Sequence, residues 1–137
     1  MLFRSQARRR KHNLPVVQLD YAFAPIDGEA TSLTMLTVVD VTTFMCLALV
    51  VPKKGICAQA TRAVRNFHIE TGRTSAVLQS DSEHSIQNLL AKIVVSVPGL
   101  SRRHSPAYSS RAMGSIGNFQ VQLYGQVRAM QIGRAHV

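Results

Sequence analysis

Apolar residues first form short β-branched runs typical of strands and later recur with a helical period, and this change predicts the order of the elements. Residues 14–23 are rich in Val and Leu and predict a strand. Residues 33–41 and 44–51 are two further apolar, β-branched runs, and Thr42 and Thr43 between them predict a hairpin. Because both runs are nearly continuous in apolar residues, we expect strands that are buried on both faces beneath helices.

A helical period begins at Ile56. Apolar residues share one helical face from Ile56 to Ile69, and Gly72 follows at the position expected of a C-terminal cap. A second amphipathic pattern over 116–130 predicts a last helix.

Between these two helices the pattern predicts short elements. Residues 76–81 read as a fourth strand that ends on an acid. The apolar residues of 86–93 predict a short helix that passes into a fifth strand at 94–97, and 101–110 read as a polar loop. Three strands followed by alternating helices and strands predict an α/β fold with a five-stranded mixed sheet and helices on both faces.

Composition narrows the classes of function. The 137 residues allow one domain, and 16 Lys and Arg against seven Asp and Glu give a net charge of +9. This charge favours a polyanionic partner, nucleic acid before a membrane surface. The longest clean apolar run, 44–51, is too short for a transmembrane helix, and no secretory signal is recognised. Cys46 and Cys57 form no Cys-x-x-Cys pair and are expected to be reduced thiols of an intracellular protein.

The two ends of the chain differ from the rest. Residues 1–5 and 132–137 resemble translated sequencing-adapter DNA, so we expect a fragment of a longer reading frame with adapter-derived ends. The expected division is a basic arm over 1–13, a folded domain over 14–131 and a tail over 132–137.

The arm carries a run of four basic residues. Two interpretations stay open, a solvated linker and an arm that contacts phosphates. The four residues are Arg8, Arg9, Arg10 and Lys11.

Acids are few, so their placement is informative. Asp20 and Asp81 each stand near the end of an apolar strand. If these strands are parallel neighbours, the carboxylates meet at one sheet edge, where open α/β sheets bind ligands. Two close carboxylates repel each other and lose solvation unless a cation lies between them, and Mg²⁺ prefers such oxygen ligands. The alternative, that both are ordinary strand-end turn residues, stays open.

Four segments resemble the integrase catalytic core, the RNase H-like domain of retroviruses and long-terminal-repeat retrotransposons. They are QLDY at 18–21, LTVVDVTTF at 36–44, LQSD at 78–81 and SPAYSSRAMGSI at 105–116. The resemblance covers nearly all of residues 14–130. It implies DNA integration by phosphodiester strand transfer, with Mg²⁺ or Mn²⁺ held by two Asp and one Glu.

The resemblance assigns the metal ligands residue by residue. Asp20 and Asp81 match the two Asp, whereas the third acidic position falls on Gly117. We therefore expect impaired strand transfer, with Gly117→Glu restoring the ligand. Glu83 is expected to be solvated rather than a replacement, and Asp40 is expected to be a structural acid of the hairpin.

The alternative function is a non-catalytic nucleic-acid-binding module with an RNase H-like fold, or a pseudogene remnant. Under either view the partner is DNA, with no membrane. The resemblance also implies a homo-oligomer and an intracellular, nuclear location. The expected phosphate contacts outside the arm, with a solvated loop as the alternative, are Arg102, Arg103, His104 and Arg111.

Overall fold

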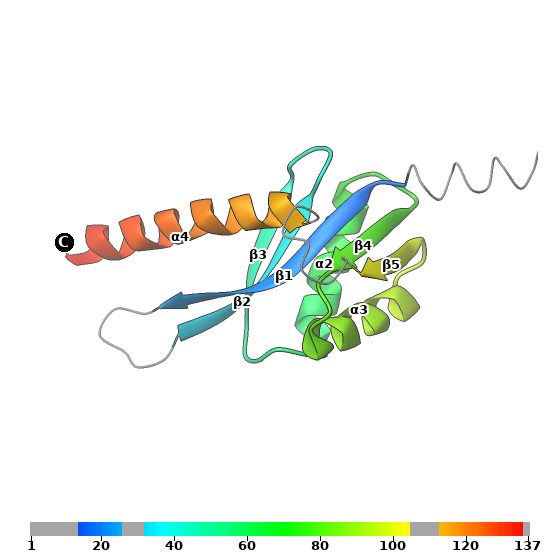
Figure 1. The fold of residues 1–137 in the computed structure, drawn as a ribbon, viewed down its shortest axis with the longest axis horizontal. Coiled ribbons are helices and arrows are strands. Elements are labelled where there is room, and N and C mark those ends of the chain that lie inside the picture. The colour runs from blue at the N-terminus through cyan, green and yellow to red at the C-terminus, as the bar shows by residue number, and fades with distance from the viewer. Residues whose placement is uncertain (1–13, 26–31, 105–112, 136–137) are drawn as a thin grey trace, which may run out of the picture.

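One sheet combines an antiparallel and a parallel half (Figure 1). The computed structural model describes residues 14–25, 32–104 and 113–135. The elements are β1 (Val16–Pro25), β2 (Ser32–Asp40), β3 (Cys46–Val51), α2 (Ala58–Glu70), β4 (Ala76–Ser80), α3 (His84–Ser96), β5 (Leu100–His104) and α4 (Gly114–Ala135). The strand order is β3-β2-β1-β4-β5. β3, β2 and β1 are antiparallel, and β1, β4 and β5 are parallel, so the predicted five-stranded mixed sheet is confirmed.

β1 joins the two halves of the sheet. It pairs with β2 over nearly its whole length, from Val17 to Pro25. Its pairing with β4 is much shorter and ends where Gln18 lies opposite Gln79. Beyond this point β1 continues with β2 while β4 stops, so the sheet opens between β1 and the end of β4.

Alternate residues of β1 face different helices, as strand geometry requires. Val17, Leu19 and Tyr21 belong to the main core, which they share with apolar residues of α2 and α3. Ala22 and Ala24 belong to a smaller cluster with residues of α4. Figure 1 shows α4 running beside β1 and β2, apart from α2 and α3, so the sheet carries helices on both faces, as predicted.

The hairpin between β2 and β3 is held by Asp40. This carboxylate is fully buried, and its Oδ1 accepts the backbone N–H groups of Thr42 at 2.9 Å and Thr43 at 3.1 Å. Its Oδ2 pairs with Arg73, which lies between α2 and β4. The predicted structural role of Asp40 in the hairpin is therefore confirmed.

The predicted burial of both hairpin strands is right for one of them. Residues 35–40 of β2 are buried, because β2 lies inside the sheet. β3 is an edge strand on which exposed and half-buried residues alternate, with Leu47 and Leu49 packed on the core. The apolar residues of 44–51 therefore led to a prediction of more burial than β3 has.

The predicted helical face of 56–69 is too wide. Ile56, which precedes α2, is 61% exposed, and Ile69 is 65% exposed. The stripe that faces the core is narrower and consists of Ala60, Val64 and Phe67, together with His68. Gly72 follows α2 with φ of +71°, and its N–H donates to the Ile69 carbonyl, which confirms the predicted C-terminal cap.

The predicted fifth strand at 94–97 is wrong. α3 continues to Ser96, because its buried stripe extends through Leu90 and Ile93 to Val97. Val95, which helped to suggest a strand, is 85% exposed on that helix. β5 instead begins at Leu100 and continues into the stretch 101–110 that was predicted to be a polar loop. As an edge strand that pairs with β4 alone, it can carry polar side chains without burying them.

None of the helices in the described part of the chain is both long and apolar enough to span a membrane.

Candidate carboxylate site

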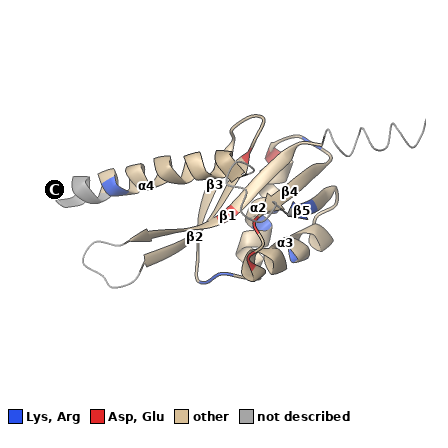
Figure 2. Cartoon of the chain, in the orientation of Figure 1, with Lys and Arg blue, Asp and Glu red and all other residues tan. Residues whose placement is uncertain are grey.

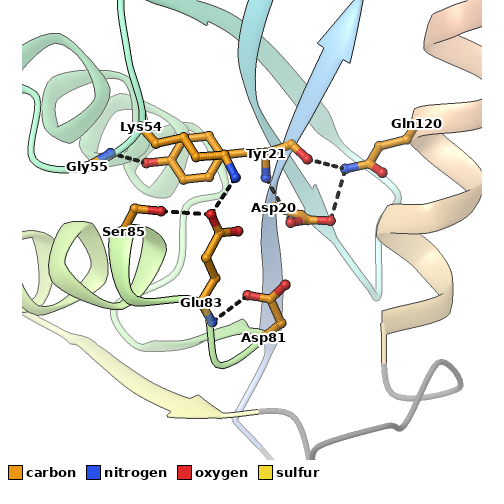
Figure 3. Close-up of polar contacts among 8 residues, drawn as sticks. All are labelled: Asp20, Tyr21, Lys54, Gly55, Asp81, Glu83, Ser85 and Gln120. Carbon is orange, nitrogen blue, oxygen red and sulfur yellow. Dashed lines mark hydrogen bonds and ion pairs between the residues drawn. The ribbon is translucent and has the colours of Figure 1, made fainter.

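Asp20 and Asp81 lie together where the sheet opens (Figure 3). β1 and β4 are parallel neighbours, as the sequence argument requires, and the pairing ends at Gln18 and Gln79. Each aspartate is two residues beyond this last pair, so the register places both at the same level. Asp20 was expected near the end of its strand, but β1 continues past it to Pro25 along β2.

The two carboxylates influence each other electrostatically. Burial raises the pKa of Asp20 most, and the charges of Asp81 and Glu83 raise it further. Hydrogen bonds from the Gln120 side chain and the Tyr21 backbone N–H act in the opposite direction without cancelling the rise in the pKa. The ionised form of Asp20 is therefore disfavoured in this position, which is the condition under which a nearby cation would be most stabilising.

The Glu83 carboxylate is paired with the side chain of a neighbouring lysine. It forms an ion pair with Lys54, its Oε1 accepts the Ser85 hydroxyl at 3.0 Å, and Lys54 lowers the pKa of this carboxyl. The Lys54 Nζ also lies 4.9 Å from the centroid of the Phe23 ring. The Glu83 side chain remains 37% exposed, in keeping with the expectation of a solvated residue, and its charge is paired with that of Lys54.

Asp81 also has a local structural task. Its Oδ1 accepts the backbone N–H of Glu83 at 3.1 Å, which closes the turn that leads into α3. Asp81 is therefore a turn residue, as the alternative interpretation held, and it also lies beside Asp20.

On α4, the residue that faces Asp20 is Gln120. The Gln120 Nε2 is 3.3 Å from Asp20 Oδ2, 3.1 Å from Thr37 Oγ1 and 3.4 Å from the Tyr21 carbonyl oxygen. Sequence reasoning assigned Gln120 only to the amphipathic pattern of the last helix. The available signal was its spacing of one helical turn from Ile116, which is buried on the same face.

Gly117 lies on the exposed side of α4. A Cβ placed on Gly117 would meet nothing within 4 Å, and neighbouring Val121 is 70% exposed. Ile116, one residue earlier, faces the sheet instead, and its N–H donates to Gln18 Oε1 at 3.1 Å.

The donor set fits one hard cation better than two. Within the described residues, no group of three or more His, Cys, Asp or Glu side chains could hold a metal ion. Asp20 and Asp81 alone match the one or two carboxylates with which proteins commonly hold Mg²⁺. A second ion would lack a carboxylate of its own among the residues described.

Three of the predicted phosphate contacts, Arg102, Arg103 and His104, lie on β5, whose Arg residues are blue in Figure 2. Arg102 and Arg103 are exposed; Arg102 Nη1 donates to the Gln87 carbonyl at 3.2 Å, and Arg103 Nη2 reaches Gln79 Oε1 at 3.5 Å. The backbone of His104 pairs in β5 opposite Ser80. The other predicted contacts, Arg8, Arg9, Arg10, Lys11 and Arg111, lie outside the described residues.

Comparison with known proteins identifies the fold through structure. No family model matches the sequence, and no curated protein matches it. A chain of the simian T-cell lymphotropic virus intasome in complex with PP2A regulatory subunit B56 gamma matches with a TM-score of 0.59 and 14% identity. The match covers 76% of this chain and 36% of that one, so this chain spans about a third of its length.

The catalytic core domain of BIV integrase matches with a TM-score of 0.51 and 17% identity. This match covers 85% of the present chain and 70% of the integrase domain. The chain therefore has the fold of a retroviral integrase catalytic core, an RNase H-like α/β fold.

Proposed function

We propose that this chain is an integrase core-like domain of a retroelement that binds DNA and has impaired strand-transfer activity. One observation carries the proposal: in an integrase-core fold, Asp20 and Asp81 are neighbours at the opening of the sheet, while Gly117 supplies no third carboxylate. The proposal covers DNA binding and impaired strand transfer by this domain. It extends to DNA integration by a longer protein that contains the domain.

Asp20 and Asp81 would hold one Mg²⁺ or Mn²⁺. When bound, such an ion supplies charge stabilisation to phosphate oxygens. The protein's part is to hold the two carboxylates side by side, and the Glu83 N–H and Tyr21 N–H orient them through one oxygen each. With neither Gly117 nor the amide of Gln120 providing a further negative ligand, the attacking and leaving oxygens would not both be stabilised.

DNA binding follows from charge. The net charge of +9 favours a polyanion, and Arg102 and Arg103 present exposed guanidinium groups along β5. Contacts of this kind read the phosphate backbone rather than the base sequence. The match to an intasome chain supports an oligomer assembled on DNA, and a DNA partner in turn supports an intracellular, nuclear location.

The test is duplex DNA binding by fluorescence anisotropy over a salt series. Affinity should fall steeply with salt, and Arg102→Gln with Arg103→Gln should reduce the log–log slope by about 2, because each neutralised phosphate contributes about 0.9. The matched control replaces Arg62 and Arg65, which are exposed on α2, and should leave the slope nearly unchanged. Binding that does not vary with salt, or that requires one sequence, would contradict the proposal.

A non-catalytic DNA-binding module is the second candidate. The observation that favours it is the hydrogen bond from Gln120 to Asp20, which gives this carboxylate a structural partner. The DNA-binding test applies equally to both candidates, and metal-dependent cleavage above the Asp81→Asn background would exclude the second.

A further inference from the structure

We propose that Gln120 blocks Asp20 from divalent cations by holding its Oδ2 with the side-chain amide. The inference rests on the proposed cation site and concerns how that site is regulated by the chain itself. Gln120 donates to Asp20 Oδ2 from the α4 side and makes this carboxylate part of the packing between α4 and the sheet.

The docking of α4 fixes where Gln120 lies. Near its start, the Ile116 N–H donates to Gln18 Oε1 at 3.1 Å, and two turns later the Tyr124 hydroxyl accepts the Phe23 N–H at 3.2 Å. Gln120 lies midway between these two contacts, one turn from each. The helix therefore aligns Gln120 with Asp20 through bonds on both sides of it.

The surroundings also fix which end of the amide faces Asp20. The Thr37 hydroxyl donates its one hydrogen to the Asp20 carbonyl at 2.7 Å, so toward Gln120 it can only accept. The Tyr21 carbonyl and the ionised Asp20 carboxylate are acceptors as well. Turning the amide over would place its oxygen against three other oxygens, so Gln120 presents N–H groups and cannot offer its oxygen to a cation there.

A cation that bound the side of Oδ2 facing α4 would therefore have to displace an existing hydrogen bond. Asp20 Oδ2 is held by Gln120, and Oδ1 accepts the Tyr21 N–H at 2.9 Å. Because the Gln120 N–H groups carry partial positive charge beside Oδ2, they would repel a cation that approached this oxygen until α4 or the side chain moved. Removing the amide should free Oδ2 while Asp20 stays beside Asp81 where β1 and β4 separate.

The experiment measures Mn²⁺ binding to the whole chain by isothermal titration calorimetry, with thermal unfolding as a second readout. Gln120→Ala should bind Mn²⁺ about tenfold more tightly than the original chain, because one hydrogen bond to a charged group no longer competes. Gln120→Glu should gain more, since it adds a carboxylate at the same position. Without Mn²⁺ this variant should unfold at a lower temperature, because the new charge faces only acceptors, and Mn²⁺ should reverse that loss.

Two controls make the result specific. Gln126→Glu adds the same charge at an exposed position of α4 and should not change Mn²⁺ affinity. Asp20→Asn in the Gln120→Ala background should abolish the gain, which shows that Asp20 is the ligand released. If Gln120→Glu does not fold, Gln120→Ala carries the test alone.

The two possible failures are distinguishable. If Mn²⁺ binds the original chain as tightly as it binds both Gln120 variants, the blocking role is wrong while the cation site stands. If no variant that folds binds Mn²⁺, the cation site at Asp20 and Asp81 is itself wrong, and the blocking role is overturned with it.

Discussion

At the scale of single residues, Asp20 places a carboxyl group where folding disfavours its ionised form. Burial and the neighbouring charge of Asp81 both raise the pKa of Asp20 above its ordinary value. The folded state therefore holds the proton on Asp20 more tightly than the unfolded state does. As pH rises through the window above the ordinary pKa of about 3.9, this difference lowers the free energy of unfolding.

Asp20→Asn should consequently stabilise the chain at pH 7. We expect a gain of up to about 1 kcal/mol after allowing for solvent screening, and a smaller gain near pH 4, where Asp20 is increasingly protonated in the original chain. Urea unfolding at the two pH values measures this, with Glu70→Gln at an exposed position of α2 as the charge-matched control. Destabilisation of equal size at both pH values would show that the hydrogen bonds of Asp20 outweigh its charge.

Gly117 offers a second prediction at this scale. It lies inside α4 with open space around its Cβ position, and helical glycine costs up to about 1 kcal/mol relative to alanine. Gly117→Ala should therefore raise the free energy of unfolding by an amount of that order, measured by urea denaturation. A loss of stability would mean that the exposed face of α4 is covered in solution.

At the scale of elements, the turn between α3 and β5 depends on Gly99. Its φ is +88°, and a Cβ would lie 1.9 Å from the Thr74 carbonyl oxygen, a backbone atom that cannot move away cheaply. Gly72, after α2, also has a positive φ, but a Cβ there would meet nothing within 4 Å. The two glycines thus share a conformational requirement and differ in the space around them.

Gly99→Ala should destabilise the chain by several kcal/mol, whereas Gly72→Ala should cost about 1 kcal/mol for its left-handed backbone alone. Thermal and urea unfolding of both variants test this difference. Equal losses would indicate that the turn shifts enough to relieve the contact with Thr74.

The same elements show how far the sequence could predict the fold. Hydrophobic patterns located three helices and four of the five strands, because each pattern reflects a face that packs on the core. They failed at 94–97, where β-branched Val94 and Val95 suggest a strand although α3 continues. They also failed to detect β5, because an edge strand is specified by its pairing with β4 rather than by apolar residues.

The site was predictable to a similar extent. The position of two acids after apolar strands indicated Asp20 and Asp81, since parallel neighbours bring strand ends together. Gln120 was not predicted as a site residue, because its role depends on how α4 docks on the sheet. That docking is set by contacts about 100 residues apart in sequence, such as Ile116 with Gln18.

At the scale of the whole molecule, the fold is that of an integrase core, but the set of metal-binding side chains among the described residues is smaller than we expect catalysis to need. The chain has the layered sheet of an integrase core, yet the described residues bring together two carboxylates rather than a larger metal-binding group. An architecture of this kind can bind DNA through its surface charge without catalysing transfer, because the two properties depend on different residues. We therefore expect this chain to bind DNA with little or no metal-dependent phosphodiester chemistry.

The most direct test is a disintegration-type DNA cleavage assay with Mg²⁺ and with Mn²⁺, on chain preparations that are first shown to bind DNA. The account predicts that cleavage by the original chain does not rise above that of Asp81→Asn. Metal-dependent cleavage by the original chain that Asp20→Asn or Asp81→Asn abolishes would contradict it, and would show that the two aspartates suffice for catalysis with Gly117 in place.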